Sequence, residues 1–278
     1  MSKGDFLLKD GFISIKFLPR IGPQNMSYGL DYTERSKYLG QYFRKQYALL
    51  KETLETPRYF REKLIYNYIY KGPVLEWYLR VKIRKEGDYQ AFHELLPQRG
   101  RILDIGCGYG FMSYMLQFAA SEREIIGFDH DEEKIAVANH CFSRNPRIHF
   151  VTCDIGQMQV VSADAMILCD VLHYLEPREQ ETLVQRCIQA LRPGGVLIIR
   201  DGDCDLKKRH RVTRMTEFFS TRLFSFNKTS GRLHYLSGKT IRDLAQGQNM
   251  DCRILDKSSR TSNLIFIISH PVKSYEKV

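Results

Sequence analysis

Three glycines, Gly106, Gly108 and Gly110, stand directly after the apolar run Ile102–Ile105. An amphipathic stretch begins at Phe111, so the residues predict a strand, a tight turn and a helix. Glycines in such a turn let the backbone approach a ligand closely, and a side chain at Gly106 or Gly108 would fill the space that a cofactor needs. The dinucleotide fingerprint G-x-G-x-x-G requires a small residue where Phe111 stands, so the spacing favours another nucleoside-containing ligand.

Four further apolar runs also end in or are followed by acids. The first run, residues 124–129, ends in Asp129, and the runs 148–152, 165–169 and 196–199 are followed by Asp154, Asp170 and Asp201. The carboxyl ends of parallel strands meet at one crevice of a doubly wound sheet, where ligands bind. A carboxylate after the second strand can accept two hydrogen bonds from a ribose diol. An acid after the third can accept one from an adenine amine. This order predicts an α/β sheet that binds an adenosine-containing cofactor.

The G-x-G-x-G turn with Asp104 in the preceding strand resembles motif I of class I S-adenosylmethionine (SAM) methyltransferases, and the resemblance extends over roughly residues 90–270. It implies a Rossmann-like, seven-stranded, mostly parallel sheet with helices on both faces, here with an N-terminal helical segment. The last strand, residues 263–269, would run antiparallel between its neighbours. The run Leu191–Gly195 matches the usual approach to the fifth strand. The implied cofactor is SAM.

The resemblance also assigns cofactor-binding roles to individual residues. Gly106, Cys107, Gly108 and Gly110 would pass the methionine part of SAM, and Asp104 would position its amino group. Asp129 would bind the ribose, and His130 would flank the adenine. Asp154 and Ile155 would contact the edge and face of the adenine. Asp170 would lie beside the methionine moiety.

The flanking residues carry a finer resemblance. Residues 66–79 and Asp201-Gly202-Asp203 resemble the methyltransferase tail of bacterial proteins that fuse an MMPL-type transporter, a lysophospholipid-type acyltransferase and a methyltransferase. Residues 10–45 resemble the end of such an acyltransferase, without its H-x-x-x-x-D motif. We therefore expect an acyltransferase-like extension over residues 1–55, a helical cap over 56–98 and the methyltransferase domain over 99–278.

Composition points to a reducing compartment. The seven cysteines form no C-x-x-C pair, and His and Cys never cluster at ligand spacing, so we expect reduced thiols and no metal site. No apolar run approaches the roughly 20 residues that cross a bilayer, and the N-terminus has no signal-peptide core. The expected localisation is cytoplasmic, with peripheral association at the inner face of the membrane as an option.

Residues 1–100 are both basic and aromatic. They carry 18 Lys and Arg against 11 Asp and Glu, 11 of the 16 tyrosines and the only tryptophan. Helices are predicted over 34–55, opened by Thr33 and stopped by Pro57, over 58–70, and from Pro73 onward. Three interpretations stay open: a cap that packs its aromatics on the sheet, a lid that faces a membrane surface, and a nucleic-acid surface.

Residues after the fourth and fifth strands are candidates for the chemistry. Enzymes that methylate nucleobase amines typically carry Asn/Asp-Pro-Pro-Tyr/Phe after strand 4, whereas this chain reads Asp170-Val-Leu-His-Tyr-Leu. This favours an oxygen or carbon acceptor. His173 is the candidate general base, Tyr174 could orient the acceptor, and Asp201 could line its pocket, although each could also serve packing or capping. The basic run 207–211 could meet an anionic acceptor, and four phenylalanines within 205–236 could cover an apolar one.

The sequence therefore predicts transfer of a methyl group from SAM to a small-molecule or lipid-like acceptor. Two alternatives remain. One is a methyltransferase that acts on RNA or another nucleic acid, which the charge favours and the strand-4 motif disfavours. The other is a module that binds SAM without catalysis.

Overall fold

A computed structural model describes residues 15–22, 31–85, 88–206, 233–257 and 262–271, and these form two compact units that divide at Thr56 and Pro57. The first unit contains the helix α1 (Tyr32–Leu54) and the stretch 15–22. Asp31 caps α1, because its side chain accepts a hydrogen bond from the backbone N–H of Glu34 at 2.8 Å. The expectation that Thr33 opens this helix is therefore wrong. None of the helices in these ranges combines the length and apolar composition of a membrane-crossing helix.

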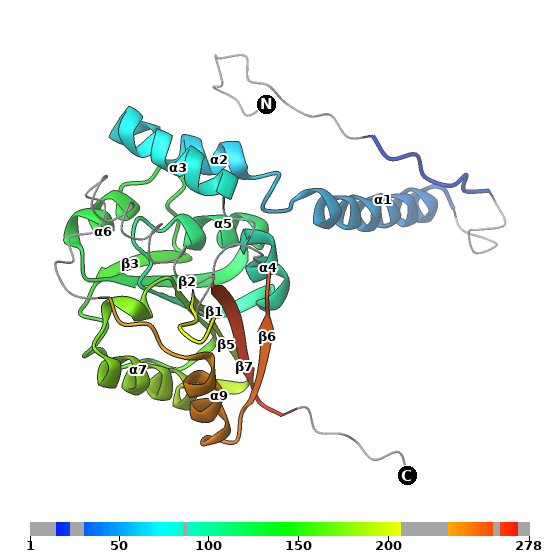
Figure 1. The fold of residues 1–278 in the computed structure, drawn as a ribbon. Coiled ribbons are helices and arrows are strands. Elements are labelled where there is room, and N and C mark those ends of the chain that lie inside the picture. The colour runs from blue at the N-terminus through cyan, green and yellow to red at the C-terminus, as the bar shows by residue number, and fades with distance from the viewer. Residues whose placement is uncertain (1–14, 23–30, 86–87, 207–232, 258–261, 272–278) are drawn as a thin grey trace, which may run out of the picture. The chain divides into compact units, whose positions relative to one another are not determined.

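The second unit is built on a seven-stranded sheet with the order β3-β2-β1-β4-β5-β7-β6 (Figure 1). Its strands are β1 (Arg99–Ile105), β2 (Glu122–Asp129), β3 (Ile148–Thr152), β4 (Ala163–Cys169), β5 (Leu191–Gly202), β6 (Asp251–Leu255) and β7 (Asn263–Ser269). The first five strands are parallel, and β7 runs antiparallel between β5 and β6. The predicted fold class is confirmed. The chain order reverses between β1 and β4, which places the crevice at the carboxyl ends of these strands.

Helices cover both faces of the sheet (Figure 1). The helices of this unit are α2 (Arg61–Tyr66), α3 (Pro73–Lys85), α4 (Asp88–Leu95), α5 (Phe111–Ala119), α6 (Glu132–Asn139), α7 (Pro177–Gln189) and α9 (Gly238–Gln246). One apolar core lies between the sheet and α4, α5 and α6, and the other lies between the sheet and α7 and α9. Successive residues of each strand point to opposite faces, so Ile102 joins the first core and Leu103 the second.

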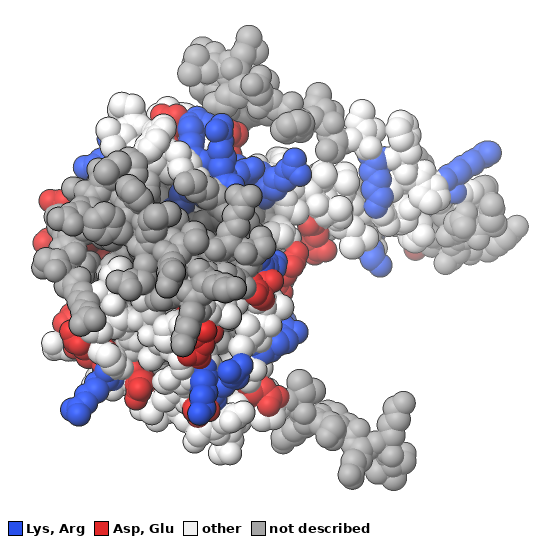
Figure 2. Space-filling model, in the orientation of Figure 1, with Lys and Arg blue, Asp and Glu red and all other residues white. Residues whose placement is uncertain are grey.

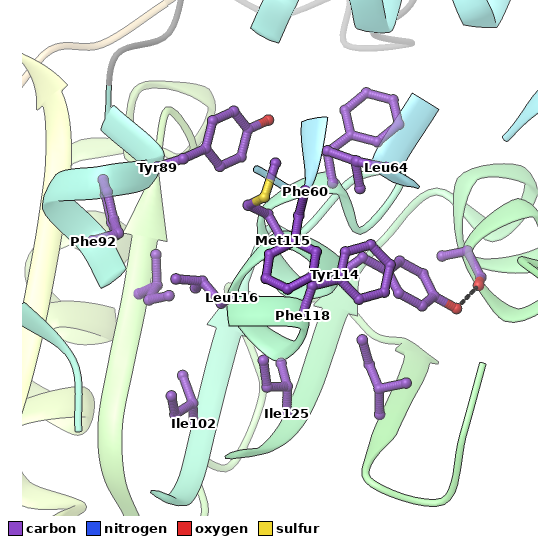
Figure 3. Packing of buried hydrophobic residues seen from close by; sticks show 14 of the residues in the cluster. Phe60, Leu64, Tyr89, Phe92, Ile102, Tyr114, Met115, Leu116, Phe118 and Ile125 are labelled. Atoms are coloured by element: carbon purple, nitrogen blue, oxygen red, sulfur yellow. Dashed lines mark hydrogen bonds between the residues drawn. The ribbon is translucent and has the colours of Figure 1, made fainter. Parts of the chain in front are cut away.

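The residues after Thr56 add a further layer outside α5. Figure 3 shows Phe60 and Leu64 beside Tyr114 and Phe118 of α5, and the rings of Phe60 and Phe118 lie 5.8 Å apart. The hydroxyl of buried Tyr68 donates to the carbonyl of Tyr109 at 2.7 Å. Phe60 thus packs on a helix that itself covers the sheet. The assignment of 56–98 as a separate cap stays a prediction.

Two helix predictions in this layer were wrong. The helix expected over 58–70 ends at Tyr66 and is followed by a short 3₁₀ turn. Next to this end, the side chain of buried Asn67 accepts a hydrogen bond from the backbone of Ser143 at 2.7 Å, a contact distant in sequence. The helix α4, with buried Tyr89 and Phe92, was not predicted. The predicted start of α3 at Pro73 is confirmed.

Candidate functional site

The glycine turn joins β1 to α5, with the backbone N–H groups of Gly106 and Cys107 both donating to the carbonyl of Phe128. Gly106 and Gly108 have φ angles of +80° and +55°, which side-chain-bearing residues rarely adopt. A Cβ at Gly106 would lie 2.3 Å from a methyl group of Val171, so packing within the protein requires this glycine. A Cβ at Gly108 would meet nothing within 4 Å. The expected open space for a ligand is therefore at Gly108 and not at Gly106.

Asp129 at the end of β2 is fixed against this turn. Its Oδ2 accepts a hydrogen bond from the backbone N–H of Gly108 at 2.8 Å, and its Oδ1 accepts one from Asp131 at 2.9 Å. The residue is buried, while the neighbouring His130 is exposed, with its Nδ1 3.4 Å from Oδ1 of Asp129. A carboxylate has about four acceptor positions. Asp129 can therefore hold the turn and still accept hydrogen bonds from a diol.

Asp104 lies beneath the turn, inside β1. It is buried and accepts a hydrogen bond from the hydroxyl of Ser113 at 2.5 Å. Burial raises the pKa of Asp104 to about 6, the Ser113 hydrogen bond opposes this rise, and the charge of Lys82 on α3 also lowers the pKa. A cationic group beside Asp104 would favour its ionised form. The resemblance predicted such a group, the amino group of SAM, at this carboxylate.

A buried lysine adds positive charge to the site. Lys134, in the first turn of α6, places its Nζ 3.9 Å from Oδ2 of Asp131 and 5.8 Å from the ring centre of Tyr109. Burial lowers the pKa of Lys134, and the charges of Asp129 and Asp131 oppose that shift. The sequence analysis missed this residue. The sequence feature that could have indicated it is its position directly after the acids at the start of α6.

Asp154 and Ile155 follow β3, whose end is joined to β2 by a hydrogen bond from the backbone of Cys153 to the carbonyl of Asp129 at 2.8 Å. Asp154 is exposed, and its Oδ1 accepts from the backbone of Gly156 at 3.0 Å. Ile155 is buried in the core that α7 and α9 cover. The described contacts therefore place Asp154 at the site edge and Ile155 mainly in the core.

Asp170 closes β4 with a φ angle of +55° and is ion-paired to Arg200 of the neighbouring strand β5. The Nε of Arg200 also lies 2.6 Å from Oδ2 of Asp88, the first residue of α4. Asp170 precedes Val171, which packs against Gly106, and Asp170 shares the positive charge of Arg200 with Asp88. Neither Arg200 nor Asp88 was found from the sequence, because their role depends on a pairing between distant segments.

His173 and Asp201 form a buried pair at the ends of β4 and β5. The Nδ1 of His173 lies 2.7 Å from Oδ1 of Asp201, and the backbone N–H of His173 donates to Oδ2 at 3.3 Å. Asp201 also accepts from the backbone of Gly202 at 2.7 Å. A carboxylate at Nδ1 favours the imidazole tautomer that carries its proton there, which leaves Nε2 as the basic nitrogen.

Aromatic rings hold His173 in place. The ring of Tyr235 stacks on it at 5.1 Å with an interplanar angle of 19°, and the ring of Tyr174 lies 4.2 Å away. The backbone of His234 donates to the carbonyl of His173 at 2.9 Å. The segment before α9 therefore covers this part of the site. The basic run 207–211 and the phenylalanines expected to cover an acceptor lie outside the described residues.

The predicted residues thus gather along one edge of the sheet. Asp104 and Asp129 lie beside the turn that contains Gly108. Val171 packs against Gly106 and begins the short segment that carries His173. The arrangement offers a carboxylate that can accept hydrogen bonds from a ribose, a second carboxylate that can bind an ammonium group, and a separate imidazole base. These groups fit an adenosyl cofactor that carries an amino acid moiety.

Known proteins share this architecture. Residues 102–195 match the protein family described as "Methyltransferase domain". A probable S-adenosylmethionine-dependent methyltransferase of Mycolicibacterium smegmatis is 28% identical over 164 residues, which cover 51% of this chain and 61% of that protein. A trans-aconitate 2-methyltransferase of Variovorax paradoxus is 31% identical over 121 residues, covering 43% of this chain and 45% of that protein. The chain spans about half the length of these two curated relatives.

A solved structure supports the fold. Human N-acetylserotonin methyltransferase in complex with SAM superposes with a TM-score of 0.52 at 18% identity, covering 73% of this chain and 58% of that one. At this identity the likeness concerns the fold. The seven-stranded sheet of this chain is the class I methyltransferase fold.

Proposed function

We propose that this chain, which carries a class I SAM-dependent methyltransferase domain, transfers the methyl group of SAM to a small-molecule or lipid-like acceptor. The hydrogen bond between Gly108 and Asp129 carries the proposal. It holds a backbone turn with open space beside a carboxylate that still has acceptor positions. One site can thereby bind the ribose while leaving room for the rest of the adenosyl ligand.

Residues in and beside the glycine turn have roles in binding this cofactor. Asp129 accepts hydrogen bonds from the ribose hydroxyls, and Asp104 interacts with the amino group, directly or through water. Gly108 leaves the backbone open beside the methionine part, and Asp170, paired to Arg200, closes that end of the site. SAM supplies an electrophilic methyl group, so the protein mainly has to align the acceptor and exclude water.

His173 is the proposed base. Asp201 holds its Nδ1, and Nε2 takes the proton of an acceptor hydroxyl as that oxygen attacks. Tyr174 lies against the imidazole and orients the acceptor. An acceptor without a proton to lose would not need this base.

The acceptor class is inferred from what the site lacks and from the relatives. No proline follows Asp170, so the sequence pattern typical of nucleobase-amine methyltransferases is absent. The printed name of one relative, trans-aconitate 2-methyltransferase, is that of an enzyme acting on a small molecule. Both observations favour oxygen or carbon of a small molecule over a nucleic acid. The relation of residues 1–55 to an acyltransferase, and of the chain to the transporter fusion proteins, rests on the sequence resemblance alone.

Calorimetric titration tests the cofactor. The chain should bind SAM and show no binding of NAD. Asp129→Ala should weaken SAM binding by about 1–3 kcal/mol, because a hydrogen bond to a charged group is lost. Asp251→Ala, an exposed acid at the start of β6, is the matched control and should bind SAM normally. Tight NAD binding, or normal SAM binding by Asp129→Ala, would contradict the proposal.

The acceptor can be found by incubating the protein with methyl-labelled SAM and fractionated cell extract. A small molecule that gains one methyl group supports the proposal. Label that appears only in RNA or DNA would support the alternative. A chain that binds SAM but labels nothing would be a non-catalytic module.

A further inference from the structure

The helix α1 carries an apolar stripe along one side. With about 3.6 residues per turn, six of its residues share that side. They are Tyr32, Leu39, Phe43, Tyr47, Leu50 and Leu54. None of the residues of α1 is buried among the described parts of the chain, and the exposed fractions of Tyr32, Phe43 and Tyr47 are 87%, 54% and 68%. A helix of this kind normally buries such a stripe.

Positive charge borders the stripe. The helix contains five Lys or Arg against two Glu, and Figure 2 shows its Lys and Arg side chains standing out from uncharged surface. Arg35 and Lys51 lie at the two borders of the stripe, whereas Glu34 and Glu52 lie on the opposite side. Lys51 also forms an exposed ion pair with Glu55 at 3.5 Å. Arg35 and Lys51 therefore border the apolar side of α1.

The stretch 15–22 contacts α1. Lys16 donates from Nζ to Oε1 of Gln46 at 3.3 Å, and Gln46 lies beside the stripe on α1. We call the six stripe residues, Tyr32, Leu39, Phe43, Tyr47, Leu50 and Leu54, together the α1 surface. It combines large apolar side chains with bordering lysine and arginine.

We propose that the α1 surface binds to an anionic membrane, with α1 lying in the plane of the headgroups. Helical stability in water comes mostly from packing an amphipathic face, so the exposed side chains of this stripe favour a partner that buries them. Aromatic side chains with bordering Lys and Arg fit the boundary between acyl chains and anionic headgroups. A second copy of α1 fits less well, because two like-charged borders would face each other and tyrosines would replace the aliphatic residues of a coiled-coil seam.

Vesicle flotation of the full chain tests this proposal. Vesicles of phosphatidylcholine alone should not carry the protein, whereas vesicles that also contain phosphatidylserine should, and added salt should reduce this binding. Phe43→Asp should weaken the binding at least about tenfold, because it places a negative charge in the centre of the stripe. Phe142→Asp is the matched control: Phe142 is 80% exposed, lies outside α1, and its replacement should leave flotation unchanged.

Three results would overturn the proposal. They are the absence of flotation with anionic vesicles at low salt, equal flotation of Phe43→Asp and the wild type, and a dimer without lipid that Phe43→Asp abolishes. The last would assign the α1 surface to a second copy of the chain. SAM binding and the thermal midpoint of each variant show whether the unit 57–278 remains folded. The outcome does not depend on the proposed methyl transfer.

Discussion

The imidazole of His173 and the carboxylate of Asp201 meet at 2.7 Å, where the ends of β4 and β5 lie side by side. Both side chains are buried, and Asp201 additionally receives two backbone N–H groups. The carboxylate is therefore held in place independently of the imidazole. Such a pair can fix both the orientation and the tautomer of a histidine that acts as a base.

Replacing His173 by Gln should lower the rate of methyl transfer by about 10²–10⁴, the usual contribution of a general base. The SAM dissociation constant should stay unchanged, because His173 lies beyond the glycine turn. The measurement is the initial rate at which label from SAM enters the methylated product, alongside calorimetric SAM binding. A purely structural His173 would instead show an unchanged rate in whatever fraction of the variant remains folded.

Asp201→Asn separates orientation from packing in the same pair. An asparagine keeps the shape but can donate to Nδ1, which moves the imidazole proton to Nε2 and removes the base. The rate should therefore fall as in His173→Gln, with SAM binding retained. If Asp201→Asn is fully active while His173→Gln is not, Asp201 does not set the tautomer.

The two glycines at the start of the turn should respond differently to substitution. Gly108→Ala places a methyl group in open space, so the protein should fold, and SAM binding should weaken by about 1–3 kcal/mol through overpacking of the ligand. Gly106→Ala should destabilise the fold itself, because its methyl group would overlap Val171. Calorimetry and urea unfolding distinguish the two effects.

Gly194 provides the matched control for these variants. Its φ angle is +78° and a Cβ there would also meet nothing within 4 Å, but it lies at the opposite end of β5 from the site. Gly194→Ala should thus carry the same backbone strain, roughly 1–2 kcal/mol, without any loss of SAM binding. A similar loss in Gly194→Ala and Gly108→Ala would mean that strain, and not contact with the cofactor, weakens binding.

The pKa of Asp104 predicts a pH dependence. Its pKa is about 6 in the folded protein and 3.8 in an unperturbed chain. The folded state therefore keeps a proton that the unfolded state loses, so stability should fall as the pH rises from below 4 through 6. The loss amounts to about 3 kcal/mol by 1.36 kcal/mol per pKa unit. Urea unfolding of the wild type and of Asp104→Asn from pH 4 to 7.5 gives the difference, and Asp104→Asn should lack this component.

SAM binding tests the same carboxyl from the ligand side. If the amino group of SAM lies beside Asp104, binding favours the ionised carboxylate and lowers its pKa. SAM affinity should then fall as the pH drops below about 6, and protons should be released on binding. Asp104→Asn should bind more weakly and lose this pH dependence. An identical pH profile in both proteins would place the amino group elsewhere.

The sheet could be predicted from the sequence because the five parallel strands contain apolar runs that end in, or lie within two residues of, an acid or a glycine. The predicted bounds of β3 and β7 match the structure. These signals are local. The predicted end of the helix at 70 was wrong, since α2 ends at Tyr66 and a short 3₁₀ turn follows, and the contact of Asn67 with Ser143 next to that end is one that no local pattern reveals.

The predicted site residues share a property: each lies at the carboxyl end of a strand, follows a strand or belongs to the glycine turn. The residues that were missed, such as Lys82, Lys134 and Arg200, are charged side chains in otherwise ordinary helix or strand positions. A lysine is usually exposed, so its type gives no indication of burial. Only the pairing of α3, α6 and β5 with the strand ends makes these charges part of the site.

Arg123 is the strongest case of a residue whose role comes from tertiary structure, because it lies between two glutamates in the sequence yet is 0% exposed. Its guanidinium donates to the carbonyls of His93, Leu96, Pro97 and Leu116, which lie at the ends of α4 and α5. Burial lowers its pKa to about 10, so it remains charged at neutral pH. One side chain thus satisfies carbonyls at the end of α4, and it adds a second hydrogen bond to the carbonyl of Leu116, which already accepts from the backbone of Ala120.

Arg123→Met should therefore lower the free energy of unfolding by at least about 3 kcal/mol, because several buried carbonyls lose their donors at once. Urea unfolding measures the change. Arg147→Met is the matched control, since Arg147 is exposed and contacts only the carbonyl of Glu122 at 3.4 Å and its exposed carboxylate at 3.8 Å; its loss should cost less than about 0.5 kcal/mol. Arg123→Lys keeps the charge but offers fewer donors and should lie between the two. Equal stability of Arg123→Met and Arg147→Met would show that water reaches these carbonyls.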